Sequence, residues 1–206
     1  DSVILEDGTY TFTVQAIGNG TTYTDSDESL QSPEYIVLPP SIGPATHNYD
    51  LYAPSDVTAT ITWRRAKSVT DAVYCVTTST ADYHALDTDD YDINDDTLTI
   101  KSSFFSGLSV TSGAAVEFVF TFNTGNTATL TVNVVDSFVP VTNITGVPDA
   151  ATAGTPLTLA GTVEPGNATN QTISWSVYND GGTGASIVGN ILSTTSAGIV
   201  TVRATI

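Results

Sequence analysis

Apolar and polar residues alternate along most of the chain. The alternation is clearest over residues 10–18, 57–63, 115–122, 128–135 and 172–177, where threonine fills many of the polar positions. Successive side chains on a β-strand point to opposite faces, and β-branched residues suit a pleated, half-solvated surface. Each of these segments is therefore predicted to be a strand with one buried face. No segment shows helical periodicity over a length that would bury one side of a helix.

The spacing of the predicted strands indicates the fold class. Gly, Asn, Asp and Pro punctuate the strands at intervals of roughly ten residues, which is typical of antiparallel sandwiches. We therefore predict an all-β chain of tandem immunoglobulin-like β-sandwiches. Proline-containing breaks occur at residues 37–44 and 136–141, and proline avoids central strands and stiffens short connections. The breaks divide the chain into three predicted domains, 1–39, 40–137 and 138–206.

The acidic stretch LDTDDYDINDDTLTI, residues 86–100, allows two interpretations. In the first, Asp95 and Asp96 form the turn of a β-hairpin, which places four apolar side chains on one face. These are Tyr91 opposite Ile100 and Ile93 opposite Leu98.

The second interpretation of this stretch is a calcium site. An EF-hand loop needs oxygen ligands at positions 1, 3 and 5, glycine at position 6 and an acid at position 12. In the register that begins at Asp92, Thr97 replaces the glycine and Ser103 replaces the final acid, and the other registers fail as well. The calcium interpretation that remains is a surface site formed by Asp87, Asp89 and Asp90. No other cofactor is predicted.

Charge and cysteine content exclude several classes of partner and fold. The chain has 22 acidic and 5 basic side chains, a formal net charge of −17, so it cannot release counterions from nucleic acid or an anionic membrane. No apolar run approaches the ~18–20 residues of a membrane helix, so no membrane insertion is predicted. The single cysteine, Cys75, excludes an internal disulfide, and it alternates with Val73 as a buried side chain would. An acidic, threonine-rich surface is typical of secreted bacterial modules, so an extracellular or cell-surface location is predicted.

The first segment contains the stretch YTFTVQAIGNGTTYTDSDESLQSPEYIV, with its alternating Tyr10, Phe12, Val14 and Ala16. This stretch resembles the last two strands of a fibronectin type III domain. It covers the C-terminal half of such a domain. An incomplete sheet with exposed edges is therefore expected over residues 1–39.

The second segment contains three motifs, SIGPATHNYDLYAPSDVTATITW (41–63), DYDINDDTLTIKSSFFSGL (90–108) and GAAVEFVFTFNTGNTATLTVNVVDS (113–137). With these motifs it resembles the X-two modules, immunoglobulin-like units of clostridial cellulosomal scaffoldins and multidomain glycoside hydrolases. The chain departs from the family pattern in WRRAKSVTDAVYC (63–75), which is bulkier and more charged. The resemblance implies an immunoglobulin-like sandwich that acts as a spacer or solubiliser, with only a weak link to carbohydrate.

In the third segment, Leu157 and Leu159 precede a turn at residues 165–169, Trp175 follows on a predicted strand, and Gly198 lies at the start of the final stretch AGIVTVRATI. This pattern resembles a bacterial Ig-like group 2 domain. The resemblance implies that Trp175 is a core residue of its sandwich.

Two observations argue against catalysis. A hydrolase needs a nucleophile with a base, or paired acids in a cleft. The two histidines, His47 and His84, stand among turn-like residues, and the GxSxG motif is absent. The protein is therefore predicted not to be an enzyme.

Carbohydrate binding is the main functional alternative. Sugar sites stack pyranose faces on exposed aromatic rings and bond the hydroxyls with Asn, Asp or Arg. The candidate ligand-binding residues are Tyr49, Tyr52, Trp63 and Arg64, with Tyr83 and Arg65 as further candidates. The structural interpretation is that these aromatic side chains cover the ends of a sandwich.

We predict a spacer array of a large extracellular bacterial protein, whose partners are neighbouring domains of the same polypeptide. The alternative is a weak carbohydrate- or cell-wall-binding accessory module of a glycoside hydrolase or adhesin, with a polysaccharide as its partner.

Overall fold

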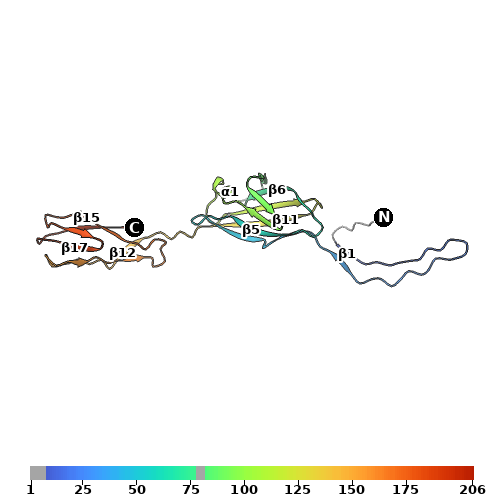
Figure 1. The fold of residues 1–206 in the computed structure, drawn as a ribbon, viewed down its shortest axis with the longest axis horizontal. Coiled ribbons are helices and arrows are strands. Elements are labelled where there is room, and N and C mark those ends of the chain that lie inside the picture. The colour runs from blue at the N-terminus through green and yellow to red at the C-terminus, as the bar shows by residue number, and fades with distance from the viewer. Residues whose placement is uncertain (1–7, 78–81) are drawn as a thin grey trace. The chain divides into compact units, whose positions relative to one another are not determined.

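The computed structural model describes residues 8–77 and 82–206 (Figure 1). Over these residues the chain forms eighteen strands and one short helix, so the predicted all-β fold is confirmed. The chain divides into two compact units, Asp1–Asp136 and Ser137–Ile206, and the finer division into three domains stays a prediction. Among the described residues, no helix has the length and apolar character needed to cross a membrane.

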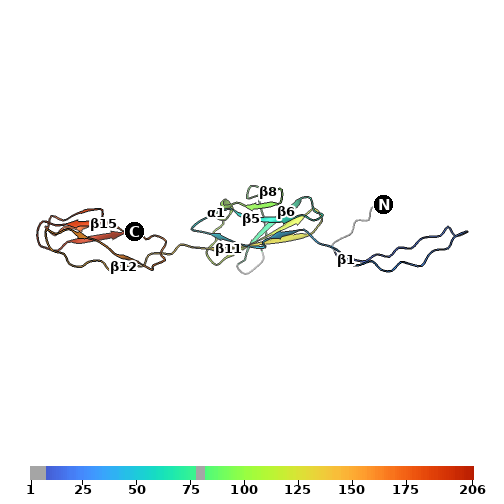
Figure 2. The same ribbon diagram turned by 60° about the horizontal axis from the view of Figure 1, so that its bottom comes forward.

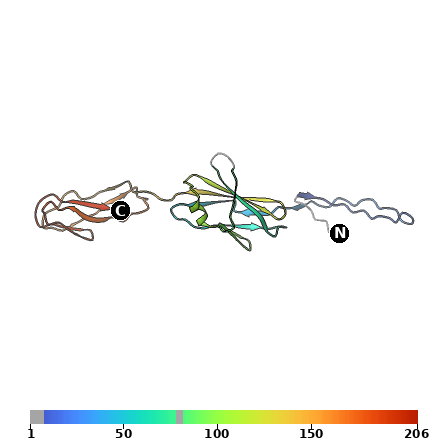
Figure 3. The ribbon, with the colours of Figure 1, turned by 90° about the horizontal axis from the view of Figure 1, so that it is seen from above.

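The first unit contains a β-sandwich of two sheets, drawn from further sides in Figures 2 and 3. One sheet has the strand order β4-β11-β10-β6-β7 and the other has the order β3-β5-β9-β8. The five strands of the first are β4 (Thr46–Asp50), β11 (Thr127–Val135), β10 (Ala115–Phe122), β6 (Val69–Val76) and β7 (His84–Ala85). The four strands of the second are β3 (Ser41–Gly43), β5 (Val57–Thr62), β9 (Thr97–Ile100) and β8 (Tyr91–Asn94).

The core between these sheets follows from the period-two pattern of the strands. In β10 every second side chain is buried, and β11 and β5 alternate in the same way. The four buried positions of β10 are Val116, Phe118, Phe120 and Phe122, each at most 1% exposed. Burying a side chain of this size contributes about 1.5–3 kcal/mol. The strands predicted over 57–63, 115–122 and 128–135 are therefore confirmed, with one face in the core.

The hairpin predicted in the acidic stretch is also confirmed. β8 pairs with β9 in the expected register, with Tyr91 opposite Ile100 and Ile93 opposite Leu98. Asp95 begins the turn with a φ of 52°, a left-handed conformation that Asp tolerates better than most residues. The apolar face of the hairpin packs on the core, and Leu98 is fully buried.

Three features of this unit differ from the expectation. β4 pairs with β11 in parallel, so the sandwich is not purely antiparallel. His47 and His84, expected in turns, lie in strands β4 and β7. A helix that the pattern did not predict, α1 (Ser102–Gly107), follows β9 and buries Phe104 and Phe105. Its six residues are too few to show helical periodicity, so the sequence pattern could not indicate it.

The segment over residues 8–38 is a hairpin whose two arms run side by side (Figure 3). At the base of this hairpin, β1 (Gly8–Tyr10) pairs with β2 (Tyr35–Val37) in a short antiparallel ladder. Beyond Tyr10 the prediction of a regular strand over residues 10–18 is wrong. From one hydrogen-bonded pair to the next, the first arm advances by two residues and the second arm by three, so the two arms cannot form a regular ladder. The N–H groups of Phe12, Val14 and Ala16 donate to the hydroxyl oxygens of Ser32, Ser29 and Ser26, each at 2.9 Å. The apolar side chains here are exposed, Leu30 by 95%.

The second unit is built from three small antiparallel sheets, with strand orders β12-β14, β13-β17-β16 and β15-β18. Its core residues include Leu159, Val163 and Leu192. Trp175, expected in a core strand, lies half-buried in β15. The strands are β12 (Asn143–Thr145), β13 (Leu157–Thr158), β14 (Thr162–Glu164), β15 (Ser174–Asn179), β16 (Ser186–Val188), β17 (Ile191–Ser193) and β18 (Thr201–Thr205).

The face assignment of the β8–β9 hairpin can be tested by paired substitutions. Leu98→Ala removes a fully buried side chain and is expected to lower the free energy of unfolding by about 2–5 kcal/mol. Thr97→Ala, at the exposed neighbouring position, is expected to change it by less than about 0.5 kcal/mol. Chemical denaturation of both variants measures these values, and equal effects would contradict the assignment.

Candidate functional site

A groove opens in the first unit between the loop that follows β5 and the edge strand β8. It has a volume of about 380 Å³ and combines two aromatic rings with charged and hydroxyl groups. Figure 2 labels β5, β6 and β8, the strands that border it. We call it the Trp63 groove, and its lining residues are Trp63, Lys67, Ser68, Val69, Thr88, Tyr91, Asp92, Ile93 and Asp95.

Two contacts position the Trp63 ring. Its edge meets Phe122 at 5.9 Å between ring centroids, with the planes at 89°, an arrangement that aromatic pairs favour. Its indole N–H donates to the backbone carbonyl of Asp95 at 3.2 Å. The ring is half-buried. It thus joins the loop after β5 to the turn of the β8–β9 hairpin.

Tyr91 is the second ring of the groove. It lies at 5.7 Å from Phe120, with the ring planes at 71°, so the core strand β10 supports both rings of the groove. Partial burial raises the pKa of the Tyr91 hydroxyl, and the nearby negative charge of Asp71 adds to this effect. The hydroxyl is therefore protonated at neutral pH and can donate a hydrogen bond.

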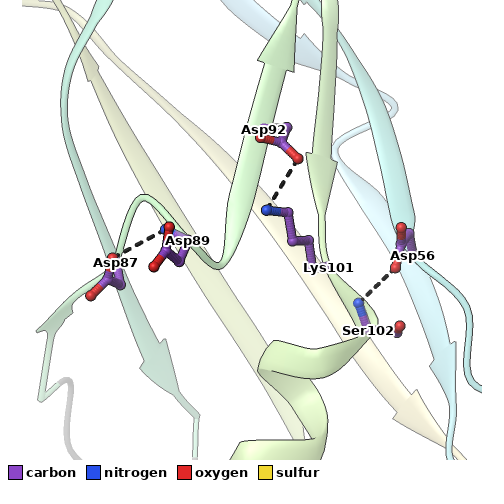
Figure 4. Close-up of polar contacts among 6 residues, drawn as sticks. All are labelled: Asp56, Asp87, Asp89, Asp92, Lys101 and Ser102. Carbon is purple, nitrogen blue, oxygen red and sulfur yellow. Dashed lines mark hydrogen bonds and ion pairs between the residues drawn. The ribbon is translucent and has the colours of Figure 1, made fainter.

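One basic residue, Lys67, lines the Trp63 groove, and others are near it in the chain. Of the five in the sequence, Arg64, Arg65 and Lys67 lie in the loop after β5, and Lys101 follows β9. Lys101 Nζ lies 3.2 Å from a carboxylate oxygen of Asp92 (Figure 4). The loop thus contributes the basic residue Lys67 to the groove lining, and the hairpin contributes the acidic residues Asp92 and Asp95.

The predicted sugar-binding residues do not form one site. Tyr49 is 3% exposed and its ring stacks on Phe105 at 4.1 Å, so this side chain belongs to the core and cannot stack on a ligand. Tyr52 is 52% exposed and lies beside Leu51, whose N–H donates to the carbonyl of Val135 at the end of β11.

Tyr52 and Trp63 lie at opposite ends of the sandwich. Trp63 packs on Phe122, whose N–H donates to Asn126 just before β11 begins. The length of β11 separates that end from Tyr52, and its nine residues span about 25 Å at ~3.3 Å per residue. Arg64 is exposed beside Trp63, so of the four predicted residues the structure brings together only these two.

The three aspartates of the predicted calcium site form a turn, and Figure 4 shows two of them, Asp87 and Asp89. The N–H of Asp89 donates to Oδ1 of Asp87 at 3.1 Å, and the N–H of Asp90 donates to the backbone carbonyl of Asp87 at 3.0 Å. Within residues 8–77 and 82–206, no group of three or more His, Cys, Asp or Glu side chains is arranged to hold a metal ion. The Asp87 carboxylate therefore accepts a hydrogen bond from the backbone of its own loop.

Tyr83, a further candidate, is engaged with a neighbouring strand. Its hydroxyl donates to the carboxylate of Glu117, and this hydrogen bond raises the pKa of the Tyr83 hydroxyl. Cys75 pairs with Glu117 across the β6–β10 ladder and is buried, as predicted.

The second unit has a hollow of its own, with a volume of about 410 Å³. Its lining consists mostly of small and aliphatic side chains, among them Ala150, Leu159 and Gly198, and includes no aromatic ring. It therefore lacks a surface on which a sugar ring could stack.

Sequence reasoning did not find most of the groove. Tyr91 was assigned to the hairpin's apolar face, and Lys67 and Asp95 were not selected. One signal was present: the stretch from residue 63 to 75 departs from the X-two pattern in bulk and charge. That departure marks the loop that contributes Lys67 to the groove lining.

Comparison with known families gives one match. The family model described as Carbohydrate binding domain X2 matches residues 42–132. This confirms the X-two resemblance of the second segment, whereas the resemblances of the first and third segments stay predictions. The search of curated proteins finds no match.

Among solved structures, one similar chain is a tri-modular GH5 (subfamily 4) endo-β-1,4-glucanase from Bacillus licheniformis, complexed with cellotetraose. It is 17% identical with a TM-score of 0.36, over 68% of this chain and 25% of that chain. Another contains the N-terminal eight Ig domains of Down Syndrome Cell Adhesion Molecule, at 13% identity and a TM-score of 0.27, over 99% of this chain and 31% of that chain. This chain thus spans a quarter of the length of the glucanase structure. Likenesses of this degree say nothing of what the chain binds.

The contact between Asp56 and helix α1 gives a prediction on pH dependence. The N–H of Ser102 donates to Oδ1 of Asp56 at 2.8 Å (Figure 4), and this hydrogen bond lowers the pKa of the carboxyl group. A carboxylate with a lowered pKa stabilises the fold above its unfolded pKa, and the contribution is lost as the pH falls through the folded value.

Asp56→Asn keeps an acceptor oxygen and removes the charge. We expect the wild type to have the higher Tm at pH ~6, and the two Tm values to converge as the pH falls below the unfolded Asp pKa of about 3.9. Thermal unfolding followed by circular dichroism measures both curves. A difference that stays constant into acid would contradict a stabilising role for the Asp56 charge.

Proposed function

We propose that residues 40–137 form a non-catalytic carbohydrate-binding module of an extracellular multidomain protein, and that a polysaccharide binds in the Trp63 groove. The observation that carries the proposal is the match of residues 42–132 to the Carbohydrate binding domain X2 family. The extracellular location follows from the proposed ligand, because structural polysaccharides lie outside the cell.

The chemistry of the groove supports this proposal. A sugar ring has apolar C–H faces that pack on aromatic side chains, and hydroxyls that need donors and acceptors at its rim. The groove is lined by the aromatic residues Trp63 and Tyr91 and by Asp95, Lys67 and Thr88, residue types whose side chains carry hydrogen-bond donors and acceptors. Its volume of about 380 Å³ lies in the lower part of the range of small-ligand sites, about 300–1,000 Å³. A short stretch of a sugar chain fits these dimensions.

The predicted spacer role is a separate proposal. It would be supported by the observation that the two units keep a fixed arrangement. A module that binds a polysaccharide also holds the rest of its polypeptide near that polymer. The two roles are therefore compatible, and only the binding role makes a claim about particular side chains.

The proposal predicts that retention on insoluble polysaccharide depends on Trp63. Trp63→Ala is expected to weaken binding about thirtyfold, since a buried aromatic side chain at the centre of an interface contributes on the order of 2 kcal/mol. Tyr52→Ala is the matched control, because this exposed tyrosine lies at the other end of the sandwich. Pull-down with cellulose, xylan, chitin and purified cell wall measures retention.

A blocking variant keeps the test independent of folding. Trp63 contacts the core through Phe122, so its removal also affects stability. Ser68→Leu changes an exposed residue of the groove and adds bulk without removing a core contact. The proposal is wrong if no polymer retains the protein, or if both groove variants bind like the wild type at an unchanged Tm.

A further inference from the structure

The distribution of basic residues around the Trp63 groove is uneven. The chain carries 22 acidic and only 5 basic side chains, yet three of the five stand within four consecutive positions, Arg64, Arg65 and Lys67. Solubility does not explain this cluster, because the net charge of −17 already keeps the protein in solution. The cluster follows Trp63 directly in the chain, and Lys67 lines the groove together with that ring.

The backbone at Arg64 supports a role beyond packing. Arg64 has a φ of 54°, which lies in the left-handed region that residues with a Cβ rarely adopt. Such a conformation costs on the order of 1 kcal/mol and persists where the surrounding structure holds it. The Arg64 side chain is exposed, so the core gains nothing from this side chain. Arg64 is thus an exposed cation one position after Trp63 in the chain.

The charges of the groove are compensated to different degrees. The acidic residue Asp92 forms an ion pair with Lys101, which reduces its repulsion of an anion. The basic residue Lys67 lines the groove with an exposed side chain. Its backbone N–H donates to Asn123 Oδ1 at 2.8 Å, which fixes the loop and leaves the ammonium to face solvent. The acidic residues farther than about 8–10 Å are screened at physiological ionic strength.

We propose that the Trp63 groove binds an acidic sugar, a unit that carries a carboxylate, as in polymers that contain uronic acids. This inference rests on the proposed function of the same groove. Trp63 packs against the face of the sugar ring, and Lys67 and Arg64 pair with the carboxylate at the rim. Asp95 accepts hydrogen bonds from the sugar hydroxyls. The ammonium group of Lys67 and the guanidinium group of Arg64 come from the same loop, and both groups bind carboxylates.

The test compares two probes that differ at the carboxyl group, which is charged in one and methylated and neutral in the other. Oligogalacturonate and its methyl ester have the same rings and linkages, but the ester lacks the carboxylate charge. The inference predicts that the wild type binds the acid more tightly than the ester, and that added salt weakens only the binding of the acid. Isothermal titration calorimetry on the full chain measures both affinities.

Charge-removing variants locate the effect. Lys67→Gln and Arg64→Asn are each expected to weaken binding of the acid about two- to fivefold, the range of exposed ion pairs, and to leave the ester unaffected. Among residues with a side chain, asparagine is one of those that best tolerate the left-handed backbone of position 64. Arg203→Gln is the matched control, because it removes the same unit of charge from the second unit, where Arg203 lies over Tyr178 at 4.4 Å.

The outcomes separate this inference from the proposed function. Equal affinity for the two probes, or retention of neutral polymers with no binding of either probe, overturns only the acidic-sugar inference. Equal losses in Lys67→Gln and Arg203→Gln assign the effect to net charge and overturn it as well. The proposed function itself fails if neither the probes nor any insoluble polymer binds.

Discussion

The burial of one face of β10 is the constraint on which the first unit depends. Its four inward side chains, Val116, Phe118, Phe120 and Phe122, hold the two sheets together. The same strand supports the groove, because Phe120 meets the edge of Tyr91 and Phe122 meets Trp63. A change in the packing of β10 would therefore reach both rings of the groove. Core and surface site share one set of aromatic contacts.

Much of this fold could be predicted because the patterns that specify its strands lie within short stretches of the sequence. The alternation along β10 and β11 specifies which face is buried, and the pattern around Asp95 and Asp96 specifies the register of the β8–β9 hairpin. Two features depend on distant partners instead. The parallel pairing of β4 with β11 and the contact between Asp56 and the first N–H of α1 join residues far apart in sequence. Neither leaves a periodic signal.

The hairpin over residues 8–38 shows how a correct local pattern can lead to a wrong element. Tyr10, Phe12, Val14 and Ala16 alternate as in a strand, yet a regular ladder needs a partner with the same spacing. The opposite arm supplies serines every third residue, at positions 26, 29 and 32, and their hydroxyl oxygens accept the N–H groups that a ladder would pair with carbonyls. Alternation thus predicts which way side chains point, whereas the partner decides whether a strand forms.

The candidate site was harder to predict than the fold because a binding residue and a core residue can have the same type. Tyr49 and Trp63 both looked suitable for stacking, but Tyr49 is enclosed by Phe105 and α1, whereas Trp63 borders an open groove. Only the tertiary structure distinguishes them. The basic residues at positions 64–67 stand out in an acidic sequence, and one of them, Lys67, lines the groove.

The central claim is that a sugar chain occupies the Trp63 groove. The most direct measurement is the NMR spectrum of the ¹⁵N-labelled chain during titration with a bound oligosaccharide. The Trp63 indole N–H, which donates to the carbonyl of Asp95, reports from within the groove, and the indole N–H of Trp175 in the second unit is an internal reference. Our account predicts that the Trp63 signal and the amide signals of Lys67 and Asp95 shift together while Trp175 does not. Shifts confined to other residues, with the Trp63 signal unchanged at saturation, would contradict it.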